Sequence, residues 1–329
     1  MQKLICFSLI AFCFPYVCNG EDLISHIEHV RKVCSGISDK MSDLKLKAGI
    51  NTAITAVGTV SSGVALGTGI AKTKVDAEAE KLEAEIQDIT EKLYDMSATQ
   101  LYIDEIPEYD DEFVMEDDSD ESDESDDAVN DIQNDLNTKK AELEKLTQKS
   151  KTLGNIRTGT LAGTAIADTA STIIAATNRV KGGLQSDIDD CAAATQELSV
   201  AYMQARMDNE DEMQLSYAEN IVRECGAWKS VNLSKINDRA TGAAVSSGIG
   251  AAMAITGTIT SAVANTDKTR NDNSESGKKH EENLNIVSNV MAGGATVASG
   301  VATVFNATQI SAIKRAATVA DNCEKALKQ

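Results

Sequence analysis

The chain is almost free of proline, and this feature restricts its fold more than any other. Pro15 and Pro107 are the only two prolines among 329 residues. A proline inside a helix removes a backbone donor and clashes with the preceding turn, so its scarcity allows long uninterrupted helices. Aromatic residues make up only 4% of the chain, and there is little of the apolar alternation that marks strands. We therefore predict an all-α protein.

Apolar residues recur every three or four positions in several stretches, which is the pattern of a coiled-coil seam. The clearest stretches are residues 23–48 and 75–96, and further seams begin at Ile132 and Ile188. Residues 48–71, which join the first two seams, contain neither charge nor proline. The sequence therefore predicts a single helix of roughly 75 residues that starts near Leu23.

An acidic block at residues 104–127 divides the first long helix from the next. It holds fifteen Asp or Glu and no Lys or Arg, and so accounts for −15 of the net charge of −20. Such a segment repels itself and cannot bury a core, so we predict a disordered acidic loop. Its flanks, residues 72–103 and 128–153, are predicted to pair as a coiled-coil hairpin, and the polar residues 267–280 are predicted to form a second loop. The remaining charge is nearly balanced without a basic stripe, which argues against nucleic acid as a partner.

The first twenty residues have the features of a signal peptide. Lys3 precedes an apolar run from Leu4 to Val17, and Cys18 to Gly20 lead into the acidic pair at positions 21 and 22. This order predicts cleavage and export to the periplasm, the extracellular space or the secretory pathway. An uncleaved membrane anchor is the alternative. Residues 21–329 would then form a single helical bundle.

Four cysteines remain after residue 20, and each occupies a core position of its seam: Cys34, Cys191, Cys225 and Cys323. The midpoints between successive cysteines are residues 112.5, 208 and 274, which fall in the acidic block, in the polar segment 208–211 and in the second loop. Residues equidistant from a hairpin tip lie at one height in two antiparallel helices. The sequence therefore predicts an up-down-up-down four-helix bundle, extended at one hairpin, with all four cysteines in one layer.

Disulfides are expected for these cysteines if the protein is exported. Neighbouring helices allow either Cys34–Cys191 with Cys225–Cys323, or Cys34–Cys323 with Cys191–Cys225. The diagonal pairing is disfavoured, and four reduced cysteines are the alternative if export does not occur.

A second layer contains stretches rich in Gly, Ala, Thr and Ser, with glycines at spacings that place them on one helix face. These candidate packing or membrane residues are Gly58, Gly63, Gly67, Gly159, Gly163, Gly242, Gly250, Gly293 and Gly300. In a soluble bundle, the small faces would let four backbones approach closely, with Ile and Val filling the gaps. In a membrane, the same faces would form a glycine zipper between inserted helices.

The length of the small-residue stretches favours the membrane interpretation, whereas their polar composition argues against it. Residues 48–71, 240–266 and 283–313 lack charge for 24, 27 and 31 residues, and a membrane span needs about 20. Against this, the stretches are rich in Thr, Ser and Asn. A fourth small-residue stretch, residues 154–177, contains the charged residues Arg157 and Asp168, and a charge at the bilayer centre is unfavourable.

No motif for a catalytic nucleophile, a nucleotide or a metal occurs, so we expect a protein without enzymatic activity, cofactor or metal site. The function expected first is a structural or protein-interaction scaffold that binds an unknown partner or itself. The alternative is a membrane-inserting or pore-forming protein that uses the small-residue helices.

Overall fold

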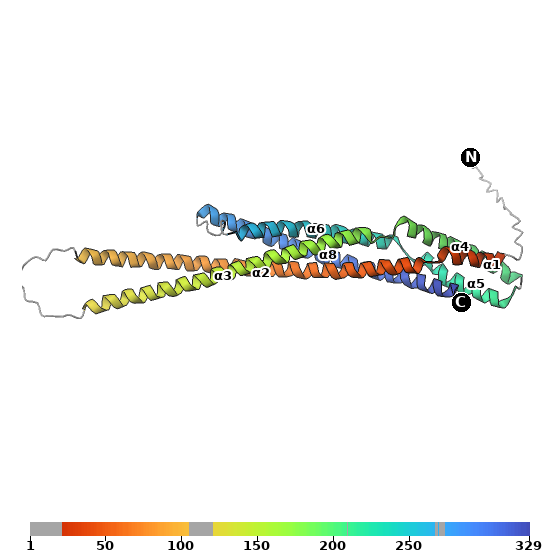
Figure 1. Cartoon of the computed structure of the whole chain (residues 1–329), viewed down its shortest axis with the longest axis horizontal. Coiled ribbons are helices and arrows are strands. Elements are labelled where there is room, and N and C mark those ends of the chain that lie inside the picture. The colour runs from red at the N-terminus through yellow and green to blue at the C-terminus, as the bar shows by residue number, and fades with distance from the viewer. Residues whose placement is uncertain (1–21, 105–120, 209, 267–268, 270–273) are drawn as a thin grey trace, which may run out of the picture. The chain divides into compact units, whose positions relative to one another are not determined.

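The computed structural model describes residues 22–329 except 105–120, 209, 267–268 and 270–273. The predicted signal peptide lies outside the described residues, as does most of the acidic block. The described residues are mostly helical and contain no strand (Figure 1), which confirms the predicted all-α bundle. The elements are α1 (Asp22–Cys34), α2 (Ile37–Asp104), α3 (Glu121–Thr177), α4 (Gly182–Met207), α5 (Glu212–Gly226), the 3₁₀ helix η1 (Ala227–Ser230), α6 (Ser234–Ala264) and α8 (Glu275–Leu327).

The prediction of a single helix from Leu23 onward was wrong, because the helix is interrupted at Ser35 and Gly36. Gly36 adopts φ +79°, and it is the only glycine with positive φ among the described residues. Glycine tolerates this left-handed conformation because it has no Cβ, and it commonly ends helices for that reason. Helix α2 then begins at Ile37 and continues for 68 residues.

Two predicted loops are shorter than expected. Helix α8 already starts at Glu275, inside the polar segment predicted as a loop, because the Ser274 side chain caps it by accepting the Gly277 N–H at 3.0 Å. Helix α3 starts at Glu121, so the last residues of the predicted acidic loop are helical.

The turn expected at residues 208–211 is present, with Asn209 outside the described residues. Asp211 caps α5 by accepting the Met213 N–H at 3.1 Å.

The chain forms two compact units. Unit 1 contains residues 22–50, 175–241 and 305–329, and unit 2 contains residues 51–174 and 242–304 of the described chain. Unit 1 has an ordinary apolar core. Every position of the first predicted seam is at most 7% exposed, and Trp228, Ile236 and Ile313 pack in the same cluster.

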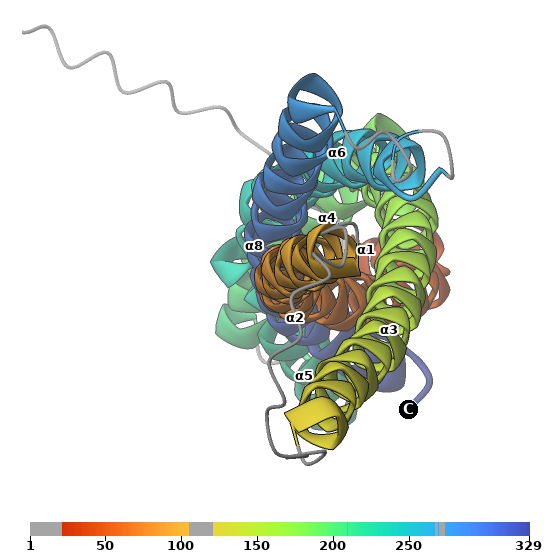
Figure 2. The same ribbon diagram turned by 90° about the vertical axis from the view of Figure 1, so that its left-hand side faces the viewer.

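Unit 2 is built from the long helices α2, α3, α6 and α8, which Figure 2 shows as separate ribbons. The predicted coiled-coil hairpin of α2 and α3 belongs to this unit. Its seam buries Val75, Leu82 and Leu136. Lys139 donates to Glu85 Oε2 at 2.7 Å across the hairpin, and this hydrogen bond lowers the pKa of Glu85.

Candidate functional site

The buried side chains of unit 2 are mostly small or polar over its central stretches, defined here as residues 51–71 of α2, 154–174 of α3, 242–264 of α6 and 286–304 of α8. Within them, Leu161 is the only buried apolar side chain larger than alanine. Eleven polar or charged residues are buried there: Asn51, Thr55, Ser62, Arg157, Thr164, Asp168, Ser171, Ser247, Ser261, Ser288 and Ser299. These stretches therefore lack the usual arrangement of a soluble bundle, in which large apolar side chains are buried and polar side chains are exposed.

The large apolar side chains of the same stretches face outward. Eighteen Val and Ile residues are between 39% and 73% exposed, and they occur on all four helices. We call this set the outer belt: Val57, Val60, Val64, Ile70, Ile156, Ile166, Ile173, Val245, Ile249, Ile255, Ile259, Val263, Ile286, Val287, Val290, Val297, Val301 and Val304. Single exposed aliphatic residues are normal on a soluble protein, whereas a large apolar surface marks an interaction site.

The expectation that Ile and Val fill the gaps between the small faces was therefore wrong. The gaps are filled by hydroxyl, amide and carboxyl groups together with alanine, Leu161 and Met253, while most of the β-branched aliphatic side chains lie outside. Unit 1 of the same chain differs, because it buries many large aliphatic residues.

Hydroxyl groups in the interior are satisfied within the bundle. Ser62 donates to the carbonyl of Gly58 at 2.9 Å, one turn earlier on its own helix. Other hydroxyls pair between helices, such as Ser171 with Ser247 at 2.9 Å and Thr158 with Ser261 at 2.8 Å. Back-bonding to the preceding turn and hydroxyl contacts between small faces are both typical of helices that pack in lipid.

Asp168 of α3 lies at the centre of this interior and is fully buried. Its Oδ2 accepts the Ser299 hydroxyl of α8 at 2.6 Å. Its carboxyl group also lies against Gly58 of α2 and Gly250 of α6, where an added Cβ would come within 3.0 Å of a carboxylate oxygen. Its Oδ1 has no hydrogen-bond partner among the residues that the structure describes. One carboxyl group therefore contacts each of the other three helices.

A charged layer lies toward one end of the central stretches. The buried Lys72 pairs with Asp76 at 2.7 Å and with Glu281 at 3.2 Å. The buried Arg157 donates to the Asn285 backbone carbonyl at 2.9 Å and to its side-chain oxygen at 3.3 Å.

The structure separates the nine predicted glycines into different environments. Gly58 and Gly250 are buried against Asp168, whereas Gly242, Gly293 and Gly300 are half-buried. The other four are exposed, with no foreign atom within 4 Å of an added Cβ: Gly63, Gly67, Gly159 and Gly163.

Sequence reasoning missed other glycines that make room for a side chain of a neighbouring helix. Gly69 faces Asn289, and Gly154 faces Asn265, each too closely for a Cβ. The signal that could have identified them is the set of asparagines in these stretches, because a polar side chain inside a small-residue bundle needs a facing position without a side chain.

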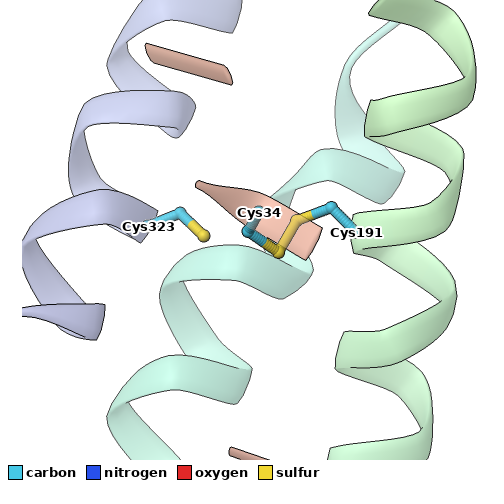
Figure 3. A group of neighbouring side chains, drawn as sticks. All are labelled: Cys34, Cys191 and Cys323. Atoms are coloured by element: carbon cyan, nitrogen blue, oxygen red, sulfur yellow. A yellow bond between two sulfur atoms is a disulfide. The ribbon is translucent and has the colours of Figure 1, made fainter. Parts of the chain in front are cut away.

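The four cysteines form two disulfides in unit 1, Cys34–Cys191 and Cys225–Cys323, with Cα–Cα distances of 4.9 and 4.5 Å. This is one of the two adjacent pairings left open by the sequence. The disulfides lie side by side, since the Sγ atoms of Cys34, Cys191 and Cys323 are within 4.8 Å of one another (Figure 3). The predicted cysteine layer is confirmed, and the disulfides fit an oxidising, exported environment.

Three parts of the described chain are long and apolar enough to cross a membrane: Leu23–Tyr94, Ser234–Ala264 and Glu275–Leu327. Their most apolar 18-residue windows have mean hydropathies of 1.4, 1.3 and 1.3, and at most 39% of any window is buried. These windows therefore present most of their residues to the surroundings. No family model, curated protein or solved structure matches the chain.

Proposed function

We infer that the protein is membrane-associating and that unit 2 enters a lipid bilayer as an intact four-helix unit. The observation that carries this proposal is the inverted polarity of the central stretches. The outer belt would face the acyl chains, and the interior hydroxyl groups would remain paired with each other and with backbone carbonyls. Ionisable residues of membrane bundles face the bundle interior in the same way.

The shape of the apolar surface favours lipid over a protein partner. Residues of the outer belt lie on all four helices of unit 2, whereas a bound protein would contact only one side of the unit. A bilayer removes water from every side, and helices satisfy their backbone hydrogen bonds internally, as lipid requires. Three of the helices also have charge-free runs of 24, 27 and 31 residues, which exceed the length of about 20 needed for a span.

The scaffold function that the sequence suggested first has less support. A water-soluble scaffold gains stability by burying its large aliphatic residues, as unit 1 does. Unit 1 fits a part that stays in water beside the membrane, and its disulfides support an oxidising compartment.

Flotation with phosphatidylcholine vesicles tests this proposal at about pH 7.5 and about pH 5. The purified protein should float with the vesicles and stay bound when they are washed with concentrated salt at the same pH. The double variant Ile255→Gln with Ile259→Gln removes two belt residues of α6 and should lower the vesicle partition coefficient at least tenfold, because each buried aliphatic side chain contributes about 1.5–3 kcal/mol.

The matched control is Val200→Gln with Met203→Gln. These residues of α4 in unit 1 are 58% and 55% exposed, compared with 47% and 59% for the α6 pair. The control should float like the unchanged protein. The proposal is wrong if the unchanged protein stays with the lipid-free fraction at both pH values, or if both double variants bind equally.

A further inference from the structure

Asp168 is the only ionisable residue in the part of unit 2 that the bilayer core would cover. Residues 48–71, 240–266 and 283–313 of the other helices contain none. On α3, Arg157 precedes and Arg179 follows a stretch of 21 residues, 158–178, in which only Asp168 can carry a charge. With a proton on Asp168, all four helices have neutral stretches of at least 21 residues, which is the length of a span.

Asp168 also lies at the depth where a charge is least tolerated. It is the middle residue of 158–178. The groups that it contacts, Gly58, Gly250 and Ser299, lie near the middles of the neutral stretches of their own helices. The contacts therefore place the carboxyl group near the midplane of the four neutral stretches together.

Within the described part of the chain, this carboxyl group has no counter-ion. The facing segments of α2, α6 and α8 contribute Gly58, Gly250 and Ser299 and carry no titratable side chain. Thr164 and Thr172 lie one turn away on α3. Among the described residues, no Lys, Arg or His forms an ion pair with Asp168, and one carboxylate oxygen has no hydrogen-bond donor.

We propose that Asp168 couples the membrane insertion of unit 2 to the uptake of one proton. The inference rests on the proposed function and assigns its regulation. An ionised carboxylate at the bilayer centre is unfavourable by about 2.5–3.5 kcal/mol, which corresponds to roughly a hundredfold in partition. The protonated acid avoids this penalty, and the interior needs no other change. Insertion is therefore stronger in an acidic compartment than at neutral pH.

The experiment measures partition into phosphatidylcholine vesicles between about pH 7.5 and pH 5. The unchanged protein should bind at least tenfold more strongly at the acidic end. Asp168→Asn removes the charge and should bind at about pH 7.5 as strongly as the unchanged protein does at about pH 5, without further pH dependence. Asp135→Asn is the matched control, because Asp135 is an exposed aspartate of the same helix outside the central stretches, and it should keep the original pH dependence.

A second variant keeps the test informative if Asp168→Asn folds poorly. Ser299→Ala removes the hydrogen bond to the ionised form, so the rise in partition should move to higher pH. Vesicle binding that is independent of pH overturns the proton coupling and leaves the proposed function intact. If the binding of Asp168→Asn still depends on pH, the proton coupling through Asp168 is also overturned. Absence of binding by every form at every pH overturns the proposed function and this inference with it.

Discussion

Gly250 and Gly163 are both helical glycines of unit 2, but they have opposite environments. A Cβ at Gly250 would collide with the Asp168 carboxylate, which Gly58 confines from the other side. We expect Gly250→Ala to lower the free energy of unfolding by about 1–3 kcal/mol, the usual penalty of overpacking. Gly163 is exposed with open space around it, so Gly163→Ala should raise stability by about 0.5–1 kcal/mol. Urea unfolding followed by circular dichroism measures both, and equal effects would contradict the packing.

The ion pair of the hairpin gives a prediction that depends on one residue, Glu85. Its pKa is lowered mainly by the hydrogen bond and charge of Lys139, with a smaller contribution from Lys81. We expect Lys139→Gln to raise the pKa of Glu85 toward the value of about 4.3 for a free glutamate. Carbon-13 NMR of the carboxyl groups during an acid titration measures it.

Lys145→Gln is the control for this titration, because Lys145 is an exposed lysine of the same helix and its loss should leave Glu85 unchanged. Because the pKa is lowered in the folded chain, the pair stabilises the hairpin above about pH 4 and loses this effect as the pH falls. An identical Glu85 titration in both variants would exclude Lys139 as the cause.

At the scale of elements, the disulfides connect helices that are distant in sequence. Replacing Cys225 and Cys323 together by alanine should destabilise unit 1 by about 2–5 kcal/mol, because the bond restricts a long segment of the unfolded chain. Thermal unfolding measures this change.

Non-reducing peptide mapping of the unchanged protein identifies the pairs directly. It should yield a Cys34–Cys191 peptide and a Cys225–Cys323 peptide. A Cys34–Cys323 peptide would contradict the structure.

Several elements could be predicted from the sequence, and their errors have physical causes. The first seam was predicted correctly, since each of its residues is buried in unit 1. The break at Gly36 was not, because Cys34 and Ile37 keep the three-residue spacing across it, and only the backbone conformation of Gly36 reveals it. The start of α8 depends on the Ser274 cap, whose effect the polar composition of the segment concealed.

At the scale of the whole molecule, the two units differ in what stabilises them in water. Unit 1 buries many large aliphatic residues, whereas the central stretches of unit 2 bury only Leu161. We expect amides of residues 51–71 and 242–264 to exchange with deuterium faster in water than those of residues 184–198, because fewer apolar contacts oppose local opening. In dodecyl maltoside, unit 2 should gain protection while unit 1 stays unchanged. Hydrogen exchange with mass spectrometry measures both, and equal protection gains would argue against the outer belt as the detergent-binding surface.

The packing of the small-residue faces of unit 2 against one another could be predicted from the sequence, but the exclusion of Ile and Val from the interior could not. Its helices have one face of Gly, Ser, Thr and Asn and another of Ile and Val. The rule for soluble proteins places the second face inside, whereas the structure places Ile249 and Val297 outside and Ser247 and Ser299 inside. Which side chains fill the space between the small faces depends on contacts among four helices, such as those of Asp168, and the sequence of a single helix does not contain this information.

The two disulfides also set the covalent topology of the chain. One bond closes a ring of residues 34–191, and the other closes a separate ring of residues 225–323. A protease that cuts each ring once would leave a single covalent molecule, with every fragment still attached. Nicked protein would therefore migrate at full size until a reductant opened the rings, and a cell could process this chain without releasing any part of it.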